Sequence, residues 1–132
     1  IIKQYSMAFT PSKSTVKDET LVEFLYADVK SDLECVPGIG PANKKALQKH
    51  GVQNTYQLVS KFLALKTEDL GVVEHCNAFF HFLQDCEIKN NRHSITKSIA
   101  EKVAISFPKL YAEIYFLEAV PEVPILEDVE MC

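Results

Sequence analysis

The chain has 132 residues, of which 47% are hydrophobic, and carries a formal net charge of −4. This length and composition predict one globular domain rather than a disordered chain, and the acidic balance excludes binding to nucleic acid through general basicity. The sequence has no apolar run near the length of a membrane-spanning helix and no signal-peptide pattern, so no membrane insertion is expected.

Residues 1–17 are rich in Ser, Thr and Lys and predict a flexible N-terminal arm. Met7 is a candidate native start, which would make residues 1–6 an addition to the natural chain. The domain itself is expected to span residues 18–118. The remaining segment, residues 119–132, is acidic and contains proline, so we expect a solvated tail, or alternatively a mask that competes with DNA for a basic face.

Apolar residues recur at helical spacing along the domain, whereas alternating segments and internal repeats are missing. The segments with helical spacing are residues 20–30, 41–50, 55–66, 68–86, 94–107 and 109–118. A short helical turn is expected at 32–35, with N-caps at Asn54 or Thr55 and at Ser94, and a left-handed stop at Gly51. The predicted fold is therefore all-α, a compact bundle of five to six short helices.

Residues 36–41 read Val-Pro-Gly-Ile-Gly-Pro and form the most distinctive stretch of the chain. Glycine adopts positive φ at low cost, so the chain can turn sharply here while Ile39 stays in the core. Pro41 suits the first turn of a following helix. A helix N-terminus behind such a turn presents free N–H groups, which bind anions and above all phosphate.

This hairpin, with Leu47 and the stop at Gly51, resembles the helix-hairpin-helix motif, in which hairpin amides hold a DNA phosphate without reading bases. A glycine-rich turn of other origin is the alternative. Through Tyr56 and Phe62–Lys66 the pattern further resembles the barrier-to-autointegration factor family over residues 18–107. That longer match needs about seven extra residues before Leu83, which is two helical turns.

The resemblance implies a small helical dimer that binds double-stranded DNA without sequence preference, with the nucleus favoured over cytoplasm or an organelle. The residues that it implies near phosphate are Gly38, Ile39, Gly40, Ala42, Asn43, Lys45, Asn91 and Arg92. Lys44 and Lys49 are candidate phosphate contacts that would replace the lysine missing at position 46. Those that it implies at a dimer interface are Tyr56, Val59, Phe62 and Leu63.

Two positions depart from the family pattern. Lys44 stands where a small residue is usual, and Ala46 stands where the family has a paired lysine. Together with the acidic balance, these departures favour an alternative function, a protein–protein interaction or scaffold module that keeps the fold but has lost DNA binding.

Other kinds of site receive little support. The sequence has no nucleophile with its base, no third glycine of a dinucleotide fingerprint and no Gly-Lys-Ser/Thr, so neither an enzyme nor a cofactor is expected. Scattered cysteines without a C-x-x-C pair favour reduced thiols in an intracellular protein; they are Cys35, Cys76, Cys86 and Cys132. His75, His81 and His93 lack ligand spacing with these cysteines, so we expect solvent histidines and no metal. The aromatic residues 79–82 are expected to fill the core, with a partner groove as the alternative.

Overall fold

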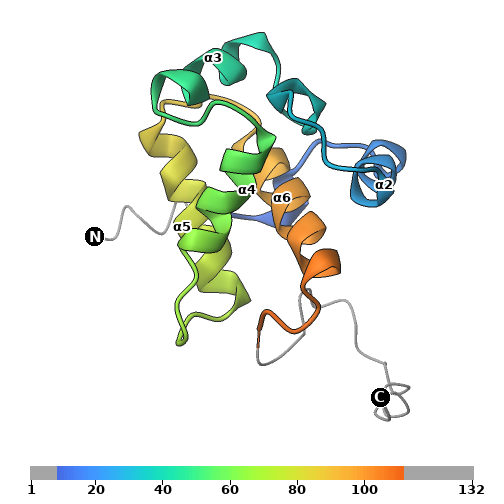
Figure 1. Cartoon of the computed structure of the whole chain (residues 1–132), viewed down its shortest axis with the longest axis vertical. Coiled ribbons are helices and arrows are strands. Elements are labelled where there is room, and N and C mark those ends of the chain that lie inside the picture. The colour runs from blue at the N-terminus through green and yellow to red at the C-terminus, as the bar shows by residue number, and fades with distance from the viewer. Residues whose placement is uncertain (1–8, 112–132) are drawn as a thin grey trace.

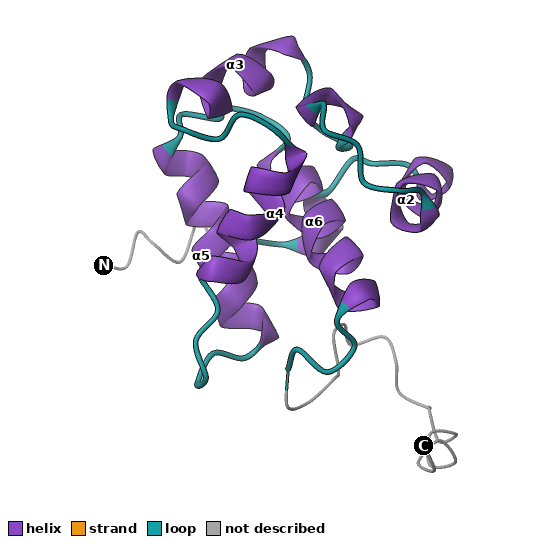
Figure 2. Cartoon of the chain, in the orientation of Figure 1, coloured by secondary structure: helices purple, strands orange, loops and turns teal. Residues whose placement is uncertain are grey.

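The computed structural model describes residues 9–111, and all regular structure within that range is helical (Figures 1 and 2). The elements in chain order are the 3₁₀ turn η1 (Pro11–Lys13), α2 (Asp18–Tyr26), the 3₁₀ turn η2 (Leu33–Cys35), α3 (Pro41–Lys49), α4 (Thr55–Ala64), α5 (Val72–Asp85) and α6 (Arg92–Ser106). The predicted all-α bundle is confirmed.

The sequence correctly predicted where α3 ends and where α4 begins. Gly51 follows α3 with a φ of +92°, which confirms the left-handed stop. Asn54 caps α4, because its side chain accepts a hydrogen bond of 2.9 Å from the Gln57 amide. Thr55, the other candidate cap, instead donates its hydroxyl to the carbonyl oxygens of Ser31 and Asp32 at 3.2 and 3.1 Å.

The starts of α5 and α6 differ from the prediction. Residues 67–71 form a turn, so α5 begins at Val72 rather than at residue 68. The N-cap of α6 is Asn91 rather than Ser94, because the helix begins at Arg92 and the Asn91 carbonyl accepts from the Ile95 amide at 2.9 Å. Asn91 has a left-handed backbone with a φ of +63°. Ser94 is buried inside the helix. Of the expected helix at 109–118, residues 109–111 form a turn and bend, and the rest lies outside the described residues, as does the predicted tail at 119–132.

Helix α6 is the central element of the bundle. It packs against α5, α2, α4 and η1, while α3 lies across one end of the molecule and α2 stands at one side (Figure 1). Neighbours on several sides explain why α6 buries polar residues as well as the expected Ile95, Ile99 and Val103. Phe107, expected on the same face, is 48% exposed just past the helix end.

The described part of the predicted N-terminal arm, residues 9–17, lies packed on α5 and α6. The Phe9 amide donates to Asn77 Oδ1 at 2.9 Å, and the Thr10 amide donates to His93 Nδ1 at 3.1 Å. Ser94 Oγ accepts from the Thr15 amide at 2.9 Å. These bonds account for the burial of Ser94 within α6.

A buried lysine joins α2 to α6. The Lys102 ammonium donates to the carbonyl oxygens of Phe24, Leu25 and Ala27 at 2.8, 3.0 and 2.5 Å. These carbonyls lie at the C-terminal end of α2, where a helix carries partial negative charge and has acceptors without helical partners. Lys102 is only 7% exposed, and its ammonium lies 5.2 Å from the centre of the Phe24 ring. This one side chain of α6 therefore fixes the C-terminal end of α2.

No helix among residues 9–111 has the length and apolar character needed to cross a membrane.

Candidate nucleic-acid interface

The candidate site begins at a tight turn over residues 36–39. The Ile39 amide donates to the Val36 carbonyl at 3.0 Å, and Pro37 and Gly38 occupy the two central positions. Gly38 has a φ of +98°, which a type II turn requires at its third residue. Val36 and Ile39 are both buried, as expected for Ile39. The turn is thus anchored in the core on both sides.

The turn is also fastened to the start of α6. A Cβ atom on Gly38 would lie 2.9 Å from Ile95 Cγ1, closer than side chains approach one another. The Gly38 carbonyl accepts hydrogen bonds from Asn43 Nδ2 at 3.1 Å and from Asn91 Nδ2 at 3.2 Å. The same Asn43 nitrogen also reaches the carbonyl and side-chain oxygens of Asn90 at 3.3 and 3.2 Å. The two separate phosphate contacts inferred from sequence are therefore neighbours.

The N-terminus of α3 carries the free donors. Gly40 is the N-cap and has no side chain to accept from the first turn. Within the part of the chain that the structure describes, the backbone amides of Gly38, Gly40, Ala42 and Asn43 donate no hydrogen bond. A Cβ atom on Gly40 would meet nothing within 4 Å, so the space beside Gly40 is open. Several free N–H groups at a helix N-terminus, with open space beside the N-cap, suit an anion.

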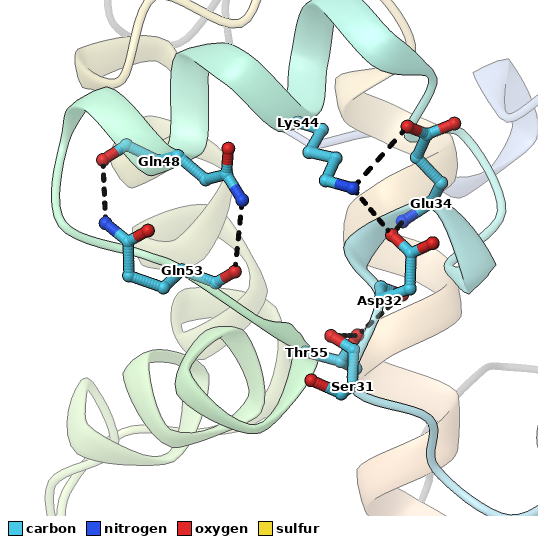
Figure 3. A network of polar contacts seen from close by, with 7 residues as sticks. All are labelled: Ser31, Asp32, Glu34, Lys44, Gln48, Gln53 and Thr55. Carbon is cyan, nitrogen blue, oxygen red and sulfur yellow. Dashed lines mark hydrogen bonds and ion pairs between the residues drawn. The ribbon is translucent and has the colours of Figure 1, made fainter.

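The lysines of α3 differ in availability. Lys44 contacts two carboxylates, with its ammonium 3.1 Å from Asp32 Oδ1 and 3.8 Å from Glu34 Oε2 (Figure 3). The hydrogen bond with Asp32 raises the pKa of Lys44, whereas the amide of Glu34 and then Lys44 lower the pKa of Asp32. Lys45 and Lys49 are exposed and form no ion pair among residues 9–111. Lys45 and Lys49 are thus the lysines of α3 whose charge is unpaired.

Arg92, predicted to contact phosphate, faces inward. Its Nη1 donates to the Ile88 carbonyl at 2.6 Å, and its guanidinium carbon lies 5.4 Å from the centre of the Phe80 ring. The side chain is half-buried. Asn91 is exposed at the edge of the site, but its amide group is held by the Gly38 carbonyl. The second predicted contact therefore serves mainly to fix the turn against α6.

The residues predicted for a dimer interface differ in how deeply their side chains are buried. Phe62 is fully buried, and Val59 and Leu63 pack partly against the core cluster. Tyr56 is 55% exposed, and its hydroxyl donates to the Val29 carbonyl at 3.3 Å. The Phe62 side chain is therefore not accessible to a second subunit. Tyr56 is the most exposed of the four predicted interface residues. Dimerisation remains a prediction.

His75 is a core residue, contrary to the expected solvent histidine. A carbonyl oxygen only accepts, so the 2.7 Å contact between His75 Nε2 and the Phe62 carbonyl places the proton on Nε2. His75 Nδ1 then accepts from the Tyr111 hydroxyl at 2.6 Å. Burial lowers the pKa of His75, so the neutral ring is favoured. The ring stacks on Phe62 with centroids 4.0 Å apart.

The cysteines and aromatics follow the prediction more closely. Cys76 and Cys86 are buried, and burial raises the pKa of the Cys76 thiol to about 12. Phe79 and Phe80 fill the core as expected, whereas His81 and Phe82 are half-buried, so the preferred interpretation of the aromatic stretch is confirmed for two of its four residues. Residues 9–111 contain no group of three His, Cys, Asp or Glu side chains that could hold a metal ion.

No protein-family model, no curated protein and no solved structure matches this chain.

Proposed function

We propose that this protein binds the phosphate backbone of double-stranded DNA without sequence preference, through a helix-hairpin-helix type turn at residues 36–40. The observation that carries the proposal is the group of free amides at the N-terminus of α3, with open space beside Gly40. Amides and lysines that hold phosphate carry no sequence information, so binding is expected to be independent of sequence. A nuclear location and a dimer belong to the same proposal through the family resemblance.

The expected affinity for one copy of the protein is weak. Lys45 and Lys49 are the exposed lysines of α3, since Lys44 is paired with Asp32 and Glu34. Each phosphate neutralised releases counterions, so two lysines predict a slope of about −2 in a plot of log affinity against log salt concentration. Useful affinity then requires several copies acting on one duplex.

A second candidate function is a protein–protein interaction module that keeps the fold without binding DNA. The observations that favour it are the carboxylates around Lys44 and the inward orientation of Arg92. Both remove positive charge that a DNA site would use.

The test is duplex binding by fluorescence anisotropy at about 50 mM and about 200 mM salt, since phosphate contacts weaken steeply over this range. The diagnostic variant is Gly40→Asp. An aspartate at an N-cap accepts hydrogen bonds from the first-turn amides and keeps or slightly raises helix stability. The Cβ of this aspartate would meet nothing within 4 Å, and its carboxylate would occupy the donors that phosphate needs.

We expect Gly40→Asp to retain its melting temperature and to lose at least about tenfold in DNA affinity. Lys45→Glu should weaken binding as well, and Lys109→Glu, an exposed lysine past the opposite end of α6, should leave it unchanged. Gly38→Glu is unsuitable because Ile95 already occupies the space beside Gly38. If the folded wild-type protein fails to bind at low salt, or Gly40→Asp binds as well as wild type, the DNA proposal is wrong and the interaction module is favoured.

A further inference from the structure

A groove of about 510 Å³ separates α2 from the Pro-Gly turn. It is lined by Thr20, Glu23, Phe24, Ala27, Asp28, Lys30, Glu34, Cys35, Val36, Pro37, Gly38, Ile39 and Thr55. Its volume falls in the range of pockets that hold a few side chains or a small ligand. The groove shares Gly38 with the group of free amides but does not include Gly40, Ala42 or Asn43, so the two features overlap at one residue.

This α2–turn groove has an apolar lining and an acidic rim. Phe24, Pro37 and Ile39 contribute apolar surface. Among the charged lining residues, three are carboxylates, Glu23, Asp28 and Glu34, against the one ammonium of Lys30. Glu34 is partly balanced by Lys44 at 3.8 Å, and Asp28 interacts with the charge of Lys102, which is bound at the adjacent Ala27 carbonyl. Glu23 forms no ion pair among residues 9–111, and the lining itself carries more carboxylates than ammonium groups. The rim therefore favours a cationic ligand and repels an anionic one.

Both walls of the α2–turn groove are fixed in place. Lys102 holds the C-terminal end of α2 through three carbonyl oxygens. The facing wall is the turn, which is held by the two asparagine side chains on the Gly38 carbonyl. A preformed groove loses little conformational entropy when a ligand enters, which favours recognition of a short segment.

We propose that the α2–turn groove docks a short segment of another protein that places one or two large apolar side chains between flanking lysines or arginines. Charge complementarity selects this occupant. The chain's own residues 119–132 carry Glu122, Glu127, Asp128 and Glu130 and would be repelled by the rim. DNA would be repelled for the same reason. This inference does not rest on DNA binding, and it supplies a partner class for the second candidate function.

The probe is a fluorescein-labelled synthetic peptide of about ten residues with a central Leu-Phe pair between lysines and arginines, a length suited to a groove of this kind. Its counterpart has every basic residue replaced by glutamate. Anisotropy titrations with the full chain should show binding of the basic peptide in the micromolar range and no binding of the acidic one. Amide chemical shifts recorded with the basic peptide should change at Ala27, Cys35 and Thr55.

Four variants locate the binding and separate it from the DNA proposal. Glu23→Lys should weaken the peptide about tenfold, and Glu68→Lys, with the same charge change on an exposed turn, should leave it unchanged. Ala27→Trp fills the groove and should abolish binding while the melting temperature is retained. Gly40→Asp should bind the peptide like wild type even where it loses DNA.

Several results would overturn the proposal. These are failure of the basic peptide to bind, equal affinity for both peptides, an unchanged affinity in Glu23→Lys, or shift changes confined to residues outside the groove. A second copy of this chain is the other ligand that the experiment distinguishes. A doubled mass in light scattering that Ala27→Trp returns to that of one chain would assign the groove to self-association instead.

Discussion

At the scale of single residues, three residues decide the shape of the candidate site. Gly38 supplies a positive φ and a close approach to Ile95. Asn43 and Asn91 meet on the Gly38 carbonyl and join α3 to the start of α6. The sequence identified these positions as phosphate contacts, whereas their side-chain amides serve to build the turn and leave the backbone amides open.

The first prediction concerns the two glycines with positive φ. Gly51→Ala has open space around its Cβ and should lower the free energy of unfolding by roughly 1–2 kcal/mol, the cost of a left-handed alanine. Gly38→Ala adds a contact with Ile95 at 2.9 Å and should cost roughly 2–4 kcal/mol, because strain from overpacking adds to the backbone cost. Urea unfolding of both variants measures the difference. Equal costs would mean that α6 shifts freely away from the turn.

The second prediction concerns Lys102. Lys102→Met keeps most of the side-chain volume but leaves three carbonyl oxygens at the end of α2 without their donor. We expect a loss of about 2–4 kcal/mol in the free energy of unfolding, since carbonyl oxygens left without a hydrogen-bond donor are costly. Lys97→Met on the same helix is the control and should cost much less. A methionine variant as stable as wild type would show that water replaces the ammonium.

At the scale of elements, α6 organises the molecule because segments from both sides of the chain pack on it. Its N-terminal turn holds the hairpin through Asn91 and the N-terminal segment through His93 and Ser94. Further along, Lys102 holds α2. A change in the first turn of α6 therefore affects the candidate site and the N-terminal segment together.

The third prediction follows from the contact between His93 and the N-terminal segment. Burial, and then Lys13 and Arg92, lower the pKa of His93 below its ordinary 6.5. The neutral Nδ1 accepts from the Thr10 amide, and a protonated Nδ1 would lose that role. The contact is therefore complete above pH 6.5 and is lost as the pH falls through the lower pKa of the folded protein.

Amide chemical shifts followed from about pH 7.5 to about pH 4.5 measure this effect, since His titrates within that range. The Thr10 amide should shift with the same midpoint as the His93 ring and below 6.5. In His50→Gln, which alters an exposed histidine, the midpoint should stay the same. If the chemical shift of the Thr10 amide does not change as His93 titrates, the contact between Thr10 and His93 is contradicted.

At the scale of the whole molecule, the fold depends on histidines that are neutral in their packed positions. His75 joins α5 to the Phe62 carbonyl of α4 and to Tyr111 after α6. Its pKa is lowered first by burial, and Lys66 lowers it further. The unfolded chain binds the proton more readily than the folded chain, so acid favours unfolding.

The fourth prediction is a fall in global stability with acid. The contribution of His75 is present above pH 6.5 and is lost as the pH falls through its lower folded pKa. Glu101 acts in the opposite direction nearer to its ordinary 4.5, because burial raises its pKa. Urea midpoints measured between about pH 7.5 and about pH 5.5 isolate the histidine effect. His75→Gln should be less stable at neutral pH and show a shallower pH dependence, and a flat wild-type profile would refute the prediction.

The sequence by itself determined the features that depend on neighbouring residues. Helical spacing located the helices, Gly51 and Asn54 marked an end and a start, and the Pro-Gly pair marked the turn, because each depends on local backbone preferences. The start of α6 was misplaced because Ser94 resembles a cap, although the adjacent Asn90 and Asn91 already suggested a left-handed residue.

Only the tertiary structure decided which candidate residues are available to a ligand. Lys102 reaches carbonyls 75 to 78 positions away, and His75 is buried by elements from both sides of its helix. Lys44 and Arg92 look equivalent to Lys45 as positive charges in the sequence, but the folded chain brings carboxylates to Lys44 and a carbonyl to Arg92. The physical reason is that charge and burial depend on the segments that lie opposite a residue, and local sequence does not specify those segments.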